Sequence, residues 1–163
     1  MDIKEMDIIK QAILNEIEGY EFYRMAAEQA NSQESVEAFI ELANEELKHA
    51  EYLMDFFDKI KDGKQDDFDL SFLSDPPSPK IYNWDKISNK SNNLAMSVFG
   101  IGVQMEKAAI DFYEQALKNT SYDNGRKLFE KLIFWENIHL EQFTTQYNRY
   151  KEEWWSDQRY SPF

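Results

Sequence analysis

The sequence contains no cysteine, so the chain forms no disulfide bond and holds no iron through sulfur atoms. It also lacks an apolar run that could cross a bilayer, because the longest one, around residues 94–103, is short and interrupted. Basic residues are few: 18 lysines and arginines stand against 31 aspartates and glutamates, which gives a net charge of −13. We therefore expect neither nucleic acid nor a membrane as a partner. Residues 1–5 lack the features of a secretory signal, and a cytoplasmic protein is expected.

At 163 residues and 19.4 kDa, the chain has the size of one domain with a proper core, and residues 1–163 are expected to form a single domain. Apolar residues recur with helical spacing in four segments. These segments predict helices at about residues 4–30, 34–61, 93–119 and 124–154. Ser32 or Ser35 can cap the start of the second helix, and Ser121 or Asp123 can cap the start of the fourth.

Residues 62–92 differ in composition from the four helical segments, and Pro76, Pro77 and Pro79 exclude a continuous helix there. About 12 extended residues would cover the ~40 Å length of such a helix, so this segment is long enough to cross a bundle. Several of its apolar residues are expected to hold it against the outside of the bundle: Phe68, Leu70, Phe72, Leu73, Ile81, Tyr82 and Trp84. The sequence thus predicts an all-α, antiparallel four-helix bundle of two helical hairpins joined by a long crossover.

Both histidines of the chain have a glutamate three residues before them, a spacing that places each pair on one face of a helix. A further glutamate stands 30 residues before each of these pairs. The two sets lie 90 residues apart at every matching position: Glu16, Glu46 and His49 in the first half, and Glu106, Glu136 and His139 in the second. One such motif is expected by chance in a chain rich in glutamate, but two in register are not.

Each of these six residues interrupts the apolar stripe that its helix is expected to bury. Four buried carboxylates must take up protons or bind cations, and two divalent ions would balance their charge. Oxygen-rich coordination completed by imidazole suits iron or manganese, and four-helix bundles provide a known template for it. The sequence therefore predicts a carboxylate-bridged site for two metal ions. The alternative is a polar core with a merely structural role.

Residues 13–54 and 103–144 align without gaps, as expected for a duplicated helical hairpin with a pseudo-twofold axis near the metal ions. Besides the six residues, the halves share six positions: Phe22/Phe112, Tyr23/Tyr113, Ala26/Ala116, Phe39/Phe129, Leu42/Leu132 and Glu51/Glu141.

Three tyrosines lie within two turns of Glu16 or Glu106 on the same helix faces: Tyr20, Tyr23 and Tyr113. They can donate hydrogen bonds or electrons to the site, or they can simply fill the core, and core filling is the expectation. No Ser–His–Asp arrangement, glycine-rich phosphate loop or basic patch competes with the site. No catalytic residue is therefore expected beyond the metal ligands.

The doubled pattern of Glu, Phe-Tyr and Glu-x-x-His resembles the rubrerythrin-like branch of the ferritin-like superfamily over about residues 3–150. The resemblance implies two iron ions, with manganese as an alternative, and oxidation of the ferrous pair by dioxygen or hydrogen peroxide. It implies three kinds of ligand: the terminal carboxylates Glu16 and Glu106, the bridging carboxylates Glu46 and Glu136, and the imidazoles His49 and His139.

Two departures from the family pattern bear on function. Full-length rubrerythrins carry a rubredoxin domain whose cysteines hold iron, so electrons must here come from ferrous iron or from an external donor such as a rubredoxin-type protein. Ala109 stands where rubrerythrins place an extra carboxylate, and its presence argues against a specialised peroxidase function. The six ligands that remain are similar to the ligand set of bacterioferritin. The tail, residues 155–163, is expected to be irregular, whereas cage-forming ferritins have a short fifth helix there. We expect the tail to pack on the bundle or on a second subunit.

Three functions stay open on this basis. The favoured one is a non-haem di-iron oxidoreductase of the rubrerythrin type, acting in oxidative-stress defence as a homodimer. The second is an iron-handling ferroxidase for storage or delivery. The third is a non-enzymatic helical partner protein with a structural metal site.

Overall fold

The computed structural model describes residues 3–69, 71 and 92–158, and these residues form four long α-helices and one short 3-10 helix. The elements are α1 (Ile3–Gln29), α2 (Gln33–Lys61), η1 (Gln65–Asp67), α3 (Asn92–Asn119) and α4 (Asp123–Asp157). Within these described residues, no helix is long and apolar enough to cross a membrane. The predicted all-α four-helix bundle is confirmed.

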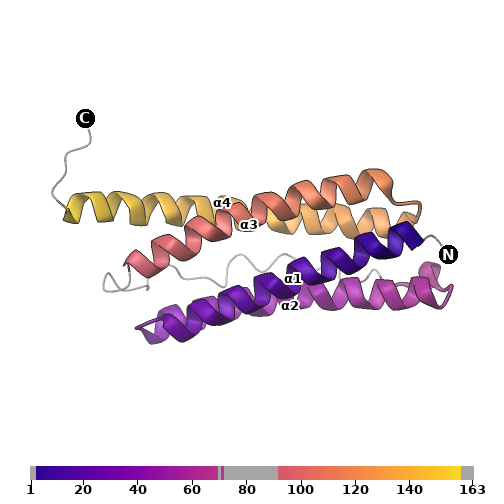
Figure 1. The fold of residues 1–163 in the computed structure, drawn as a ribbon, viewed down its shortest axis with the longest axis horizontal. Helices are drawn as coiled ribbons and strands as arrows, with labels where there is room; N and C mark the ends of the chain where they lie inside the picture. The colour runs from indigo at the N-terminus through magenta and orange to yellow at the C-terminus, as the bar shows by residue number, and fades with distance from the viewer. Residues whose placement is uncertain (1–2, 70, 72–91, 159–163) are drawn as a thin grey trace.

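The helices form two antiparallel hairpins, α1 with α2 and α3 with α4, which pack side by side (Figure 1). α2 ends and α3 begins at opposite ends of the bundle, as the predicted crossover requires (Figure 1). Most of the apolar residues expected to anchor the crossover lie outside the described residues. Phe68 is described, and it is buried with its ring centroid 5.0 Å from that of Phe56 in α2.

The start of α2 follows the sequence prediction. Ser32 is its N-cap, with φ −128° and ψ 149°, and its hydroxyl accepts the backbone N–H of Ser35 at 3.2 Å. At the other end of α2, Lys59 and Lys61 lie in the last turn, where positive charge complements the helix dipole. Gly63 follows with φ 70°, a left-handed conformation that costs glycine little, and the chain leaves the helix there.

The start of α4 differs from the prediction. Its N-cap is Tyr122, which makes no capping bond through its side chain, so neither Ser121 nor Asp123 caps the helix. Ser121 instead donates its hydroxyl to Glu5 at 2.7 Å and its backbone N–H at 3.1 Å, and the hydroxyl of Thr120 also donates to this carboxylate. Glu5 is buried, and it ties the first turn of α1 to the turn between α3 and α4. A tertiary partner has therefore taken the place of a local cap.

The end of α4 also lies further along the chain than expected. The helix runs to Asp157, so Trp155 is helical and not part of an irregular tail. The indole of Trp155 packs edge-on against Trp154, with ring centroids 5.0 Å apart, and remains 44% exposed. Residues 159–163 lie outside the described residues, and with them the rest of the predicted tail.

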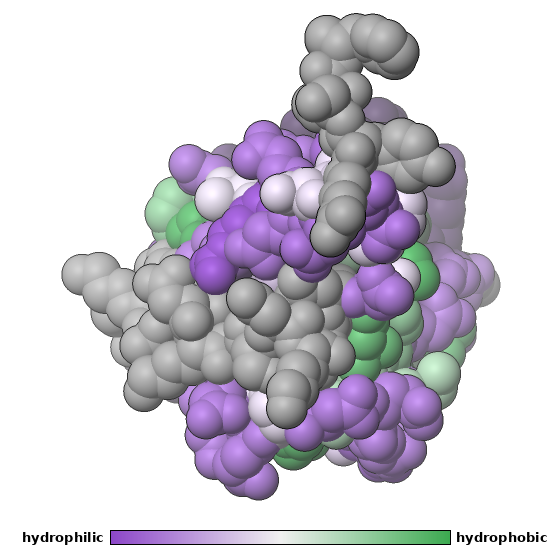
Figure 2. All heavy atoms as spheres, turned by 90° about the vertical axis from the view of Figure 1, so that its left-hand side faces the viewer, coloured by the Kyte–Doolittle hydropathy of each residue, from purple (hydrophilic) through white to green (hydrophobic). Residues whose placement is uncertain are grey.

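The buried apolar residues form two clusters with a polar layer between them. One cluster includes Tyr23, Phe39, Leu42, Phe99, Phe143 and Tyr150. The other includes Ile9, Leu53, Phe56, Tyr113, Phe129 and Leu132. Each of these side chains contributes roughly 1.5–3 kcal/mol by leaving water. Outside, hydrophilic residues cover most of the described surface at one end of the bundle, with small apolar patches between them (Figure 2).

Candidate metal centre

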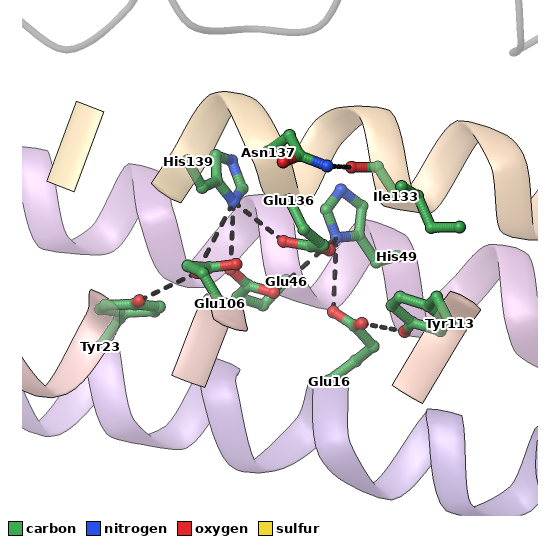
Figure 3. A network of polar contacts seen from close by, with 10 residues as sticks. All are labelled: Glu16, Tyr23, Glu46, His49, Glu106, Tyr113, Ile133, Glu136, Asn137 and His139. Carbon is green, nitrogen blue, oxygen red and sulfur yellow. Dashed lines mark hydrogen bonds and ion pairs between the residues drawn. The ribbon is translucent and has the colours of Figure 1, made fainter. Parts of the chain in front are cut away.

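The six residues singled out from the sequence all lie in the polar layer between the two apolar clusters, and the side chains turn toward one another (Figure 3). α1 and α3 each supply one glutamate, whereas α2 and α4 each supply a glutamate and a histidine. None is more than 5% exposed: Glu16, Glu46, His49, Glu106, Glu136 and His139. The interrupted apolar stripes therefore meet at one place in the interior.

His49 faces three carboxylates through its Nδ1 atom. This nitrogen lies 2.9 Å from Glu136 Oε1, 3.3 Å from Glu16 Oε2 and 3.7 Å from Glu46 Oε2. Ligand atoms of these four residues all lie within 4.8 Å of one another, so a single cation could contact all four.

His139 faces a second, overlapping set. Its Nδ1 atom lies 3.2 Å from Glu136 Oε2, 3.6 Å from Glu46 Oε1 and 3.8 Å from Glu106 Oε1. These four residues also offer ligand atoms within 4.8 Å of one another. The two sets share Glu46 and Glu136 and differ in the remaining glutamate and histidine, which is the arrangement that a carboxylate-bridged pair of ions requires.

Two tyrosines join α1 to α3 at the site. The hydroxyl of Tyr23 in α1 donates to Glu106 Oε1 in α3 at 3.3 Å, and the hydroxyl of Tyr113 in α3 donates to Glu16 Oε1 in α1. These bonds match the internal duplication, and both rings also pack in the core, where they were expected as filler. Tyr20 is only half-buried, and its ring lies beside Arg24.

Burial and charge shift the pKa values of the metal-free cluster in different directions. Burial, together with the neighbouring carboxylates, raises the pKa of Glu46 and of Glu106 well above the ordinary value. Burial alone would raise the pKa of Glu136 too, but the charge of His49 and a hydrogen bond with His139 hold it well below that value. Burial disfavours charge on His49, yet Glu136 and Glu16 outweigh it and raise the pKa of His49 to about 10. In the absence of metal, protons thus carry the positive charge that the cluster needs.

The chemistry of these atoms fits divalent cations. Buried atoms that make no hydrogen bond include Glu16 Oε2, Glu46 Oε1, Glu136 Oε1 and His49 Nδ1. Unsatisfied groups of this kind are costly in a protein interior, and all four face the middle of the cluster. Carboxylate oxygen with imidazole nitrogen is a donor set that suits iron or manganese.

A pocket reaches the carboxylates from the side of α1 and α3. Its volume is about 180 Å³. Three of the six residues line it, Glu16, Glu46 and Glu106, whereas neither histidine does. The cluster is therefore buried but not sealed.

Sequence reasoning missed the aromatic surroundings of the histidines. Trp135 stacks on His49, with ring centroids 5.1 Å apart and planes 3° apart, and Tyr52 stacks on Trp135 at 5.9 Å. Phe143 stacks on His139 at 5.6 Å. The internal repeat could not signal Trp135, because the matching position in the first half is Glu45.

Comparison with known families identifies a relationship. A family model described as Rubrerythrin matches residues 7–147, a span that contains the six residues of the cluster. No match was found among curated proteins or among solved structures.

Proposed function

The chain belongs to the rubrerythrin family, and on this premise we propose that it is a non-haem di-iron protein that oxidises a ferrous pair with hydrogen peroxide or dioxygen. Its role would be that of an oxidoreductase in oxidative-stress defence. The observation that carries the proposal is the pair of overlapping four-residue groups that share Glu46 and Glu136.

The proposed ligand set follows from the contacts in the cluster. Glu46 and Glu136 belong to both groups and would bridge the two ions. The remaining ligands would be terminal, with Glu16 and His49 on one ion and Glu106 and His139 on the other. When bound, a ferrous pair supplies two electrons, which with two protons reduce one hydrogen peroxide to two molecules of water.

The protein itself would orient the ligands and keep bulk water away. Tyr23 and Tyr113 fix the rotation of the terminal carboxylates by donating to Oε1 of Glu106 and of Glu16. In Glu16 this leaves Oε2, the oxygen that faces His49, for metal. Burial and the nearby carboxylates raise the pKa of both tyrosines well above the ordinary value, so they stay protonated and keep donating. The two apolar clusters cover the site along the bundle axis.

A ferroxidase that serves iron storage or delivery is the second candidate. Ala109 favours it, because this half-buried residue supplies no extra carboxylate beside Glu106. With no cysteine in the chain, incoming ferrous iron could be the electron source. In the first candidate the electrons come from an external donor such as a rubredoxin-type protein, and a homodimer is the proposed assembly for either reaction.

Anaerobic stopped-flow mixing tests the proposal. Protein loaded with ferrous iron is mixed with peroxide or with oxygen, and absorbance of the ferric product is followed. Faster reaction with peroxide supports the peroxidase role, whereas faster reaction with oxygen and continued turnover of added ferrous iron support ferroxidation. The variant E46A should bind less iron and react more slowly, and unchanged iron content and rate would refute the assigned ligands.

Size-exclusion chromatography adds an independent measurement. A dimer would argue against storage inside a shell, whereas an assembly of many subunits would favour it. A protein that is purified without metal, and folds equally well with a chelator present, would favour the purely structural role.

A further inference from the structure

The pocket beside the cluster exists because two matching positions of the internal repeat carry small residues. Gly19 in α1 and Ala109 in α3 lie 90 residues apart, and each lies one turn after the glutamate that its helix supplies. Both line the pocket, together with Ala108. A Cβ atom added at Gly19 would lie only 3.3 Å from Glu46 Cγ, so any larger residue there would press on the cluster.

The charges of the lining residues favour cations. Among the residues that the structure describes, none of those that line the pocket is basic. Glu18 is exposed and lines the pocket on the α1 side, and Asn15 adds an amide beside it. The inner wall is formed by carboxylates, among them Glu16 and Glu46, each with a buried oxygen that makes no hydrogen bond. Such a path draws in divalent cations and repels anions.

The size of the pocket suits an ion with part of its water shell. A volume of about 180 Å³ has room for an ion together with several water molecules. Neither histidine lines the pocket, and both come from the other two helices, α2 and α4. An arriving ion would therefore meet carboxylates first, which can replace water oxygens one at a time, and imidazole last.

We propose that this pocket is a cation port, through which divalent metal ions pass from solvent to the carboxylates while the bundle stays closed. Glu18 attracts the ion at the mouth, and Gly19, Ala108 and Ala109 keep the passage open. The port rests on the proposed function in one respect, namely that the carboxylates of the cluster bind metal.

The test is the rate at which metal-free protein takes up cobalt(II), with the indole of Trp135 as reporter because it stacks on His49. The parent for all variants carries W84F, W154F and W155F, so that one of the four tryptophans remains. Stopped-flow fluorescence gives the uptake rate, and equilibrium titration gives the number of ions bound. Neither measurement depends on activity of the loaded enzyme.

The variant A108F places a ring at the mouth of the pocket without touching the core, since Ala108 is exposed. Its control is K107F, because Lys107 is also exposed, lies next to Ala108 in the chain and does not line the pocket. We expect A108F to slow uptake at least tenfold with the same final stoichiometry as the parent, and K107F to stay within twofold. Loss of a positive charge in K107F does not hinder a cation.

Two further variants sharpen the test. E18Q should slow uptake severalfold and make the rate less sensitive to salt, because it removes the charge that attracts the ion. A109L should slow uptake as A108F does. If A108F and A109L take up cobalt as fast as the parent with normal stoichiometry, the port is refuted and the metal centre stands. If the parent itself binds no cobalt, the metal centre is refuted and the port with it.

Discussion

Replacing each of the two proposed bridging glutamates by glutamine should distinguish two residues that the internal repeat makes equivalent. Glu46 and Glu136 occupy matching positions, yet the pKa of Glu46 is raised by burial and neighbouring carboxylates, whereas that of Glu136 is lowered by His49. Burial therefore favours the neutral acid form of Glu46 in metal-free protein, and glutamine resembles that form in shape and charge. Glu136 is a carboxylate that faces a protonated imidazole at 2.9 Å.

The expected magnitudes follow from this difference. E46Q should change the unfolding free energy of the metal-free protein by less than about 1 kcal/mol. E136Q should lower it by about 3 kcal/mol, the low end for breaking a buried ion pair, because Glu16 still faces His49. For a chain of this size, each kcal/mol shifts the melting temperature by about 2–4 °C, so E136Q should melt roughly 6–12 °C lower.

Addition of metal, in contrast, should affect the two variants alike. An ion present at a thousand times its dissociation constant stabilises the native protein by about 4 kcal/mol. Both variants should lose most of this gain, because each lacks one carboxylate that belongs to both groups. Thermal melts followed by circular dichroism, with a chelator and then with manganese(II), measure both effects. Equal melting temperatures for metal-free E46Q and E136Q would show that Glu46 and Glu136 do not differ in protonation. If metal raised the melting temperature of either variant as much as that of the unmodified protein, that residue would not be a bridging ligand.

Three further predictions concern other polar side chains of the bundle. Y23F and Y113F should each weaken metal binding by about 10–100-fold, measured by metal titration, while the protein stays folded. An unchanged affinity would show that the two tyrosines only fill the core. E5A should lower the unfolding free energy by about 1–3 kcal/mol in chemical denaturation without changing the number of metal ions bound, because the buried hydroxyl of Thr120 loses its acceptor, whereas the exposed Ser121 can donate to water. The pKa of His49 rises from 6.5 to about 10 on folding, so its contribution to the stability of metal-free protein should be complete below pH 6.5 and be lost as pH approaches 10. Denaturation midpoints across this range check the last prediction, which would be contradicted if stability rose toward pH 10.

The cluster could be predicted from the sequence because its signals are local and repeated. A spacing of three residues places Glu46 beside His49 on a helix whatever surrounds it, and the helical period of apolar residues shows that this face is buried. The repeat then supplies a second copy of each signal. The four-helix bundle follows from the same apolar stripes, since each can be buried only against the others.

Other features depend on tertiary contacts that no local pattern encodes. Glu5 looks like an ordinary acidic residue in the first turn of a helix, but its partners Thr120 and Ser121 are more than 100 residues away. The cap predicted at Ser121 was wrong for this reason. The hydrogen bonds of Tyr23 and Tyr113 likewise cross between hairpins, so the sequence could place these residues near the site but could not show to which carboxylate they donate.

The two halves agree in their ligands and differ in what surrounds the ligands. His49 stacks on Trp135, whereas His139 stacks on Phe143, and the position that matches Phe143 in the first half is Leu53. Of the two bridging candidates, Glu136 lies closer to each imidazole than Glu46 does, at 2.9 and 3.2 Å against 3.7 and 3.6 Å. Groups around the ligands tune the affinity of a metal ion, so two ions held here would not be equivalent despite the duplicated sequence. Duplication of a hairpin thus accounts for the two overlapping groups of glutamate and histidine, while divergence around these groups would let one of two proposed metal sites fill, or react, before the other.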